Sequence, residues 1–176
     1  HEEIAESHPR EPGSRRLFHQ YAAMASYRRL SETCADISAA RIYVDYADWH
    51  YLNVAERLEI YSPKEMFDRL GALIQRDPLR PEVRYMAAAA AVQFEDARVA
   101  LLLAVQAADA ARDAREKPLP LPTDARVEWL ALRIAISCAK ALDKKDFARK
   151  MAARAVAAGG PRELFEEFLD PVVEVN

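Results

Sequence analysis

Residues 45–51, which read DYADWHY, hold the densest group of side chains that could do chemistry. Asp45, Asp48 and His50 offer carboxylate oxygens and an imidazole nitrogen, which are ligands for divalent metals and common acids and bases of catalysis. On a helix, Asp45 and Asp48 share a face, whereas His50 points elsewhere. The spacing favours a solvated acidic face opposite an aromatic core face, so no metal is predicted. A helical enzyme that uses the acidic face of residues 45–59 is kept as the second alternative.

The two cysteines, Cys34 and Cys138, are far apart in the sequence and fit no metal-ligand spacing. Their apolar helical contexts favour inert, small hydrophobic side chains. A disulfide between them is the alternative if the protein is exported. The chain has no glycine cluster for a phosphate loop, no G-x-S-x-G and no H-E-x-x-H. The sequence therefore predicts no catalytic residues and no cofactor.

The composition favours an all-helical fold. Of the 176 residues, 51% are hydrophobic and 30% are charged, and there are only four glycines. Alanine is very common, and it is the best helix former, whereas glycine is one of the poorest. Strand-like runs of β-branched residues are limited to ARIYV before Asp45 and PVVEV near the end. We expect a single all-α domain over residues 15–176, after a flexible lead-in over residues 1–14.

The charge and hydropathy exclude two classes of partner. The net charge is -3, with a pI near 5.9, which does not point to nucleic acid. No apolar run approaches the roughly 20 residues of a membrane span, so no direct membrane insertion is expected. Because the chain begins at His1 without Met, we expect a trimmed product whose targeting segment is missing. The compartment is left open between bacterial cytoplasm and periplasm, since the Ala and Arg usage suits a bacterial source.

Apolar spacing and helix-boundary residues predict about seven helices. Ser14 is expected to cap the first, and Pro63 to occupy the first turn of the third. Thr123 or Asp124 is expected to cap the sixth, after a proline-rich connector over residues 116–124. The expected helices cover residues 15–32, 45–61, 63–75, 81–94, 96–115, 125–142 and 144–158, followed by a short capping helix over residues 162–169.

Small residues recur where two antiparallel helices must come close. In a frame of about 34 residues that begins at Pro81, Ala88, Ala100 and Ala107 fall at the eighth, twentieth and twenty-seventh places. Those places hold small residues in tetratricopeptide repeats, and the chain resembles that family. The repeat-like units are 47–80, 81–114 and 129–161, and the last has Ala148 and Ala155 at the twentieth and twenty-seventh places.

The resemblance implies helical hairpins stacked as a short superhelix, with the first helix of each unit lining a concave groove. It implies an interaction scaffold, or an accessory factor for assembly or secretion, that binds a segment of another protein or peptide. Self-association is left open, and nucleic acid is not expected. Transferred by place, the groove residues include Asp48, Tyr51, Glu59, Glu82, Tyr85, Ala89, Val92, Gln93, Leu130, Arg133, Ser137 and Lys140.

The first alternative is a helical domain that binds or senses a small molecule, because the alanine-rich middle leaves room for an apolar ligand. Charge is also uneven along the chain: acids dominate residues 45–68 and bases dominate residues 133–154. Such a distribution can orient a partner and speed its encounter, but it is equally compatible with ordinary helix surfaces. The tyrosines gather in the first part of the chain, where they favour either recognition or packing.

Overall fold

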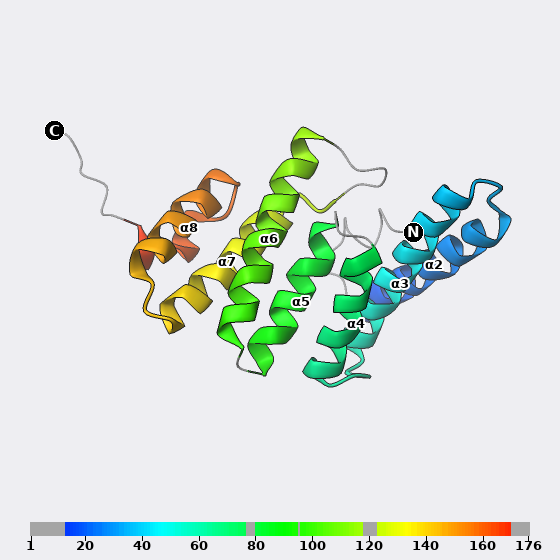
Figure 1. Ribbon diagram of the computed structural model, residues 1–176, viewed down its shortest axis with the longest axis horizontal. Helices are drawn as coiled ribbons and strands as arrows, with labels where there is room; N and C mark the ends of the chain where they lie inside the picture. Colours follow the sequence, from blue (N-terminus) through cyan, green and yellow to red (C-terminus); the bar gives the residue numbers. More distant parts are fainter. Residues whose placement is uncertain (1–12, 77–79, 95, 118–122, 170–176) are drawn as a thin grey trace. The chain divides into compact units, whose positions relative to one another are not determined.

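The computed structural model describes residues 13–76, 80–94, 96–117 and 123–169, and within these ranges it is all-α, without strands (Figure 1). This confirms the predicted fold class. Apart from the second helix and the short capping helix, the predicted helices agree with the observed ones to within two residues. The elements are α2 (Gly13–Thr33), α3 (Ile37–Arg57), α4 (Pro63–Arg76), α5 (Pro81–Gln93), α6 (Ala97–Glu116), α7 (Val127–Ala141), α8 (Lys145–Ala157) and the 3-10 turns η1 (Arg162–Leu164) and η2 (Glu166–Phe168).

The chain divides into two compact units, His1–Pro78 and Leu79–Asn176. The stacking of all the repeat-like units into one superhelix stays a prediction. The predicted lead-in lies mostly outside the described residues, as do residues 118–122 of the proline-rich connector.

In the first unit, α2 and α3 form a hairpin through an aromatic contact. The Tyr27 ring stacks on His50, with ring centroids 5.7 Å apart and planes 9° apart, and it lies 5.4 Å from Tyr46. The prediction that the helix begins near Asp45 was wrong, because α3 begins at Ile37. The Asp36 carboxylate caps it by accepting the Ser38 N–H at 2.8 Å, so the ARIYV run is helical and not a strand.

Helix α4 begins with a capping box. The Glu65 carboxylate accepts the backbone N–H of Ser62 at 2.9 Å and its hydroxyl at 2.7 Å, while Ser62 Oγ accepts the Glu65 N–H at 3.3 Å. The hydrogen bonds from Ser62 lower the pKa of Glu65. Pro63 occupies the first turn, as predicted. The buried Leu70 and Leu73 lie on the inner face of this helix.

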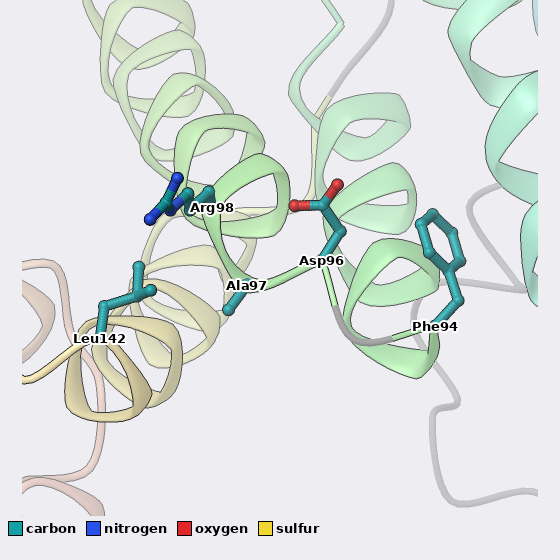
Figure 2. Close-up of a pocket in the computed structure, with 5 residues that line it drawn as sticks. All are labelled: Phe94, Asp96, Ala97, Arg98 and Leu142. Carbon is teal, nitrogen blue, oxygen red and sulfur yellow. The ribbon is translucent and has the colours of Figure 1, made fainter.

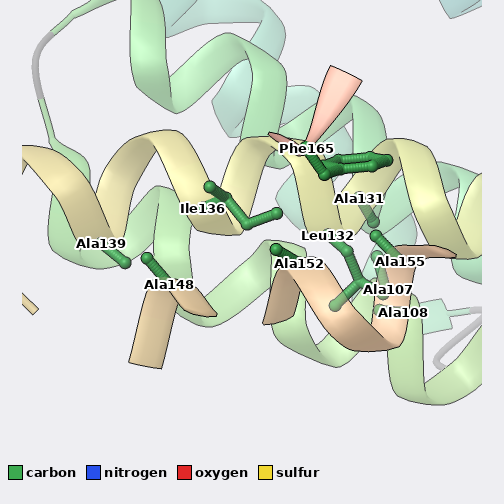
Figure 3. Close-up of a cluster of buried hydrophobic side chains, with 10 residues drawn as sticks. All are labelled: Ala107, Ala108, Ala131, Leu132, Ile136, Ala139, Ala148, Ala152, Ala155 and Phe165. Carbon is green, nitrogen blue, oxygen red and sulfur yellow. The ribbon is translucent and has the colours of Figure 1, made fainter. Parts of the chain in front are cut away.

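The second unit consists of the hairpins α5–α6 and α7–α8, and α7 also contacts both α5 and α6. Alanine lies where these helices meet: Ala88 of α5, Ala104 of α6 and Ala135 of α7 form one fully buried cluster. A second cluster joins α6, α7 and α8 (Figure 3). Every alanine that the sequence placed at a helix crossing is buried, which confirms that expectation for Ala88, Ala100, Ala107, Ala148 and Ala155.

Helices α3, α7 and α8 end in the same hydrogen-bonded turn, the Schellman motif. At the end of α3, the Ile60 N–H donates to Ala55 O at 2.9 Å and the Glu59 N–H to Glu56 O at 3.1 Å. The turn requires a left-handed residue, and Glu59 adopts φ 52°. The corresponding residues after α7 and α8 are Asp143, with φ 54°, and Gly159, with φ 88°.

Glycine at the first two of these positions is expected to stabilise the protein. Left-handed backbone costs a residue with a Cβ about 1–2 kcal/mol, and glycine loses part of this gain as unfolded-state entropy. We expect Glu59→Gly to raise the free energy of unfolding by about 1 kcal/mol, and Asp143→Gly by less, because Asp tolerates this conformation. Urea unfolding tests this, with Gly159→Ala as the reverse control. A loss of stability in Glu59→Gly would contradict the expectation.

The predicted α-helix over residues 162–169 is instead the two 3-10 turns η1 and η2. The turns bury Phe165 in the cluster that joins α6, α7 and α8 (Figure 3). The Phe165 ring also lies against Gly160. A Cβ at Gly160 would approach Ala155 O and Phe165 Cε2 to 2.8 Å, so only glycine permits this fit. Leu164, by contrast, is 47% exposed. The conformation of this segment is therefore set by burial of the Phe165 ring, and not by burial of a helix face.

Two helix starts also differ from the expectation. Helix α2 begins at Gly13, so Ser14 lies inside it and not before it. Asp124 does lie at the start of α7: its Oδ1 accepts the Arg126 N–H at 2.8 Å, and its carbonyl accepts the Val127 N–H at 3.0 Å. Helical geometry begins at Val127, because the first turn is tighter than an α-turn.

Candidate functional site

In the first unit, the predicted groove residues make contacts within the protein. Arg76 of α4 donates to Asp48 at 2.7 Å, and its other terminal nitrogen lies 3.3 Å from Asp45. The hydroxyls of Tyr51 and Tyr61 are 2.8 Å apart, and this hydrogen bond raises the pKa of Tyr51. Glu59 lies in the turn after α3 and not on a helix. These contacts tie α3 to the segment that follows it.

Asp45 and Asp48, on the acidic face of residues 45–59, make different contacts from His50. Asp45 and Asp48 face Arg76, whereas His50 is 3% exposed and lies under the Tyr27 ring. Among the residues described, His, Cys, Asp and Glu side chains form no group of three that could hold a metal ion. The contacts of this face are those of a helix–helix junction.

Both cysteines are free thiols in the structure. Cys138 is buried in α7, and burial raises the pKa of its thiol. A raised pKa keeps the thiol protonated and therefore unreactive. Cys34 is half-buried in the turn between α2 and α3.

The second unit presents a continuous surface on α5 and α7, which we call the α5/α7 face. It combines apolar side chains with polar and basic ones, and all of them are at least partly exposed. The residues lie on the outward stripe of each helix, at spacings of three and four. They are Tyr85, Ala89, Val92 and Gln93 of α5, and Leu130, Arg133, Ile134, Ser137 and Lys140 of α7.

The two stripes of the α5/α7 face adjoin. Tyr85 of α5 packs against the cluster that contains Ala131 of α7. In return, Ile134 of α7 packs against the cluster that contains Ala88 of α5. The alanines beneath let the two helices approach closely, so the apolar side chains above them form one surface.

Glu82 was predicted to line the groove, but the structure buries it at 6% exposure. Its Oε1 accepts the backbone N–H of Asp124 at 2.9 Å, and its Oε2 lies 3.7 Å from Arg80 Nε. Burial raises the pKa of Glu82, although Arg80 opposes the shift. Glu82 therefore connects the start of α5 to the segment before α7 and is not part of the α5/α7 face.

This buried carboxyl predicts a pH dependence of stability. With a raised pKa, the folded state holds the Glu82 proton more tightly than the unfolded state, whose glutamate pKa is about 4.3. The contribution is complete below the unfolded value and is lost as pH rises through the folded one. We expect the free energy of unfolding of the wild type, minus that of Glu82→Gln, to fall as the pH rises above about 4.3, the unfolded-state value. Denaturant unfolding at a series of pH values above this point measures the difference. A constant difference would contradict the prediction.

The second unit has a surface depression of about 390 Å³ (Figure 2). It is lined by Phe94, Asp96, Ala97, Arg98 and Leu142, from the α5–α6 turn, the start of α6 and the end of α7. The Asp96 carboxylate already caps α6 by accepting the Val99 N–H at 3.1 Å. The volume is near the low end of the roughly 300–1,000 Å³ of ligand sites.

Two groups of residues that sequence reasoning missed stabilise the second unit or lie at its α5/α7 face. Glu128, at 2% exposure, accepts from Arg115 and from Arg154 Nε at 3.1 Å. Arg154 also donates to Asp109 at 2.7 Å, so α6, α7 and α8 share one ion network. Glu167 of η2 pairs with Lys140, and Phe168 lies beneath it. No local pattern marks these residues, because their partners come from other helices.

None of the helices, in the part of the chain described, combines the length and hydropathy required to cross a bilayer. Comparison of the chain with protein-family models, with curated protein sequences and with solved structures finds no match.

Proposed function

We propose that this protein is an interaction scaffold that binds a segment of another protein along the α5/α7 face. The observation that carries the proposal is the partly exposed apolar stripe formed by Tyr85, Ala89, Val92 and Ile134 on two adjoining helices. In a tetratricopeptide-like arrangement, these are the first helices of successive hairpins. Helix α5 has 13 residues, or about 20 Å of length, which suits an extended or helical segment better than a small molecule.

The remaining surfaces of the second unit support this choice. The second helices of the hairpins, α6 and α8, bury alanine on one side and expose mostly charged side chains on the other. The depression at Phe94 is small, and one of its few polar groups, Asp96, already caps a helix. A role in assembly or secretion is one form of such a scaffold and is part of the proposal.

Site-specific photo-crosslinking tests the proposal. A photoreactive residue at Ala89 or at Ser137 is expected to form crosslinks to a polypeptide in cells that express the protein. The same residue at Gln106, which is exposed on α6, is the matched control and is expected to give little crosslinking. Equal crosslinking at Gln106, or none at the α5/α7 face, would contradict the proposal.

A substitution in the depression distinguishes the scaffold proposal from the small-molecule alternative. Leu142→Trp is expected to fill the depression without reaching the α5/α7 face. The scaffold proposal expects unchanged crosslinking at Ala89 and Ser137. Loss of a co-purifying small molecule in Leu142→Trp, together with absent crosslinks, would favour a ligand-binding domain instead.

A further inference from the structure

The charges of α5 and α7 are sorted by sign between the core and the surface. The only acids in these two helices are Glu82 and Glu128, which are 6% and 2% exposed. Both lie beside arginines, so their charge is compensated inside the fold. The bases Arg84, Arg133 and Lys140 remain at least partly exposed. The outward charge of the two helices is therefore entirely positive, although the whole chain is net negative.

Two of these bases lie on the α5/α7 face at a fixed spacing. Arg133 and Lys140 are seven residues apart on α7, which is about 10 Å along the helix axis. Arg133 has no ion-pair partner among the described residues. Ser137 lies between them, and Leu130 and Ile134 lie beside them, so the positive groups border apolar surface.

The structure already places a carboxylate at one of the two positions. Glu167 of η2 reaches Lys140 Nζ with both oxygens, at 3.0 and 3.3 Å. Lys140 and Glu167 side chains are 62% and 63% exposed, so the pair is screened by water and weakly held. The Lys140 Nζ also lies 5.4 Å from the Phe168 ring centroid. An acidic residue, Glu167, and an apolar one, Phe168, therefore lie side by side next to Lys140 of α7.

Resting on the proposed function, we infer that the bound protein segment is acidic and apolar, with two carboxylates about 10 Å apart that meet Arg133 and Lys140. Glu167 occupies the Lys140 position in the free protein and competes with the second carboxylate. In a helical segment, a spacing of about 10 Å corresponds to residues seven apart, which share one face of the helix.

The test uses the whole chain and synthetic probes. One fluorescent peptide carries leucines on one face and two glutamates seven residues apart, and a matched peptide has glutamines in their place. Fluorescence anisotropy is expected to show binding of the glutamate peptide at least several-fold tighter than the glutamine peptide, with the difference lost in high salt. Arg133→Gln is expected to reduce this preference by about two- to fivefold. Glu167→Gln is expected to raise the affinity for the glutamate peptide by about twofold. Lys150→Gln on α8, an exposed charge change away from the face, is the control and is expected to change neither affinity.

Equal affinity for the two peptides, or binding of neither, would overturn the inference while leaving the proposed function to the crosslinking result. Weaker binding of the glutamate peptide in Glu167→Gln would overturn the competition by Glu167. Single-stranded DNA of the same charge is used as a competitor, to test whether the face binds any polyanion. If it displaces the glutamate peptide as well as unlabelled peptide does, a specific protein segment is excluded.

Discussion

Replacing Glu128 with alanine is expected to lower the free energy of unfolding of the second unit by about 3 kcal/mol. The Glu128 carboxylate is 2% exposed and lies between Arg115 of α6 and Arg154 of α8. The Arg154 side chain is only 21% exposed and keeps Asp109 as its other partner. Removal of the carboxylate leaves the guanidinium of Arg154 undercompensated in the protein interior. Arg115 is 48% exposed and can regain water, which places the loss at the lower end of the range for buried pairs.

Urea unfolding with constant m-value measures this loss as a shift of the midpoint. Glu166→Ala is the matched control, because Glu166 is exposed and makes no ion pair among the described residues. It is expected to stay within about 0.5 kcal/mol of the wild type. If Glu128→Ala behaves like Glu166→Ala, the network does not hold α6, α7 and α8 together.

Leucine at Ala107 is expected to destabilise the second unit by about 1–3 kcal/mol. Ala107 is fully buried and packs in the cluster that contains Ala131 and Leu132 of α7 (Figure 3). The added side chain has no space unless the helices move apart, because alanine at the contact lets the two helices approach closely. Leucine at Ala104 is likewise expected to push α6 away from Ala88 of α5 and Ala135 of α7.

Thermal or urea unfolding gives the size of this effect, and Gln106→Leu on the exposed side of α6 is the control for leucine itself. The control is expected to change stability by less than about 0.5 kcal/mol. An Ala107→Leu variant as stable as Gln106→Leu would mean that close approach at the alanines does not define the packing.

The sequence predicts the helices and the alanine crossings because both depend on local or strictly periodic signals. Pro63 and Pro81 each begin a helix, and Ala88, Ala100 and Ala107 are buried at the expected places. The capping box at Ser62 and Glu65 was also visible as S-x-x-E, and the cap at Asp36 as a polar residue before an apolar helix. Asp36 marks the observed start of α3.

The site was predicted less well because burial and pairing depend on segments that are distant in the sequence. Glu82 occupies a place that lines the groove in tetratricopeptide repeats, yet the backbone of Asp124 reaches it and removes it from the surface. The same repeat frame places Lys140 in the groove. Its partner Glu167, however, lies in a 3-10 turn for which the sequence predicts an α-helix. Sequence spacing specifies which side chains lie on the same face of a helix. It does not specify which other segments cover that face.

The most direct test of the central proposal is methyl NMR of the full chain during titration with its polypeptide partner or with the acidic probe peptide. The α5/α7 face contains reporter methyl groups on Ala89, Val92 and Ile134, and Leu102 on α6 is an exposed reference. We predict that the signals of these three residues shift with the bound fraction while that of Leu102 does not. Shifts confined to Leu102, or to Leu142 in the depression, would contradict the assignment of binding to the α5/α7 face.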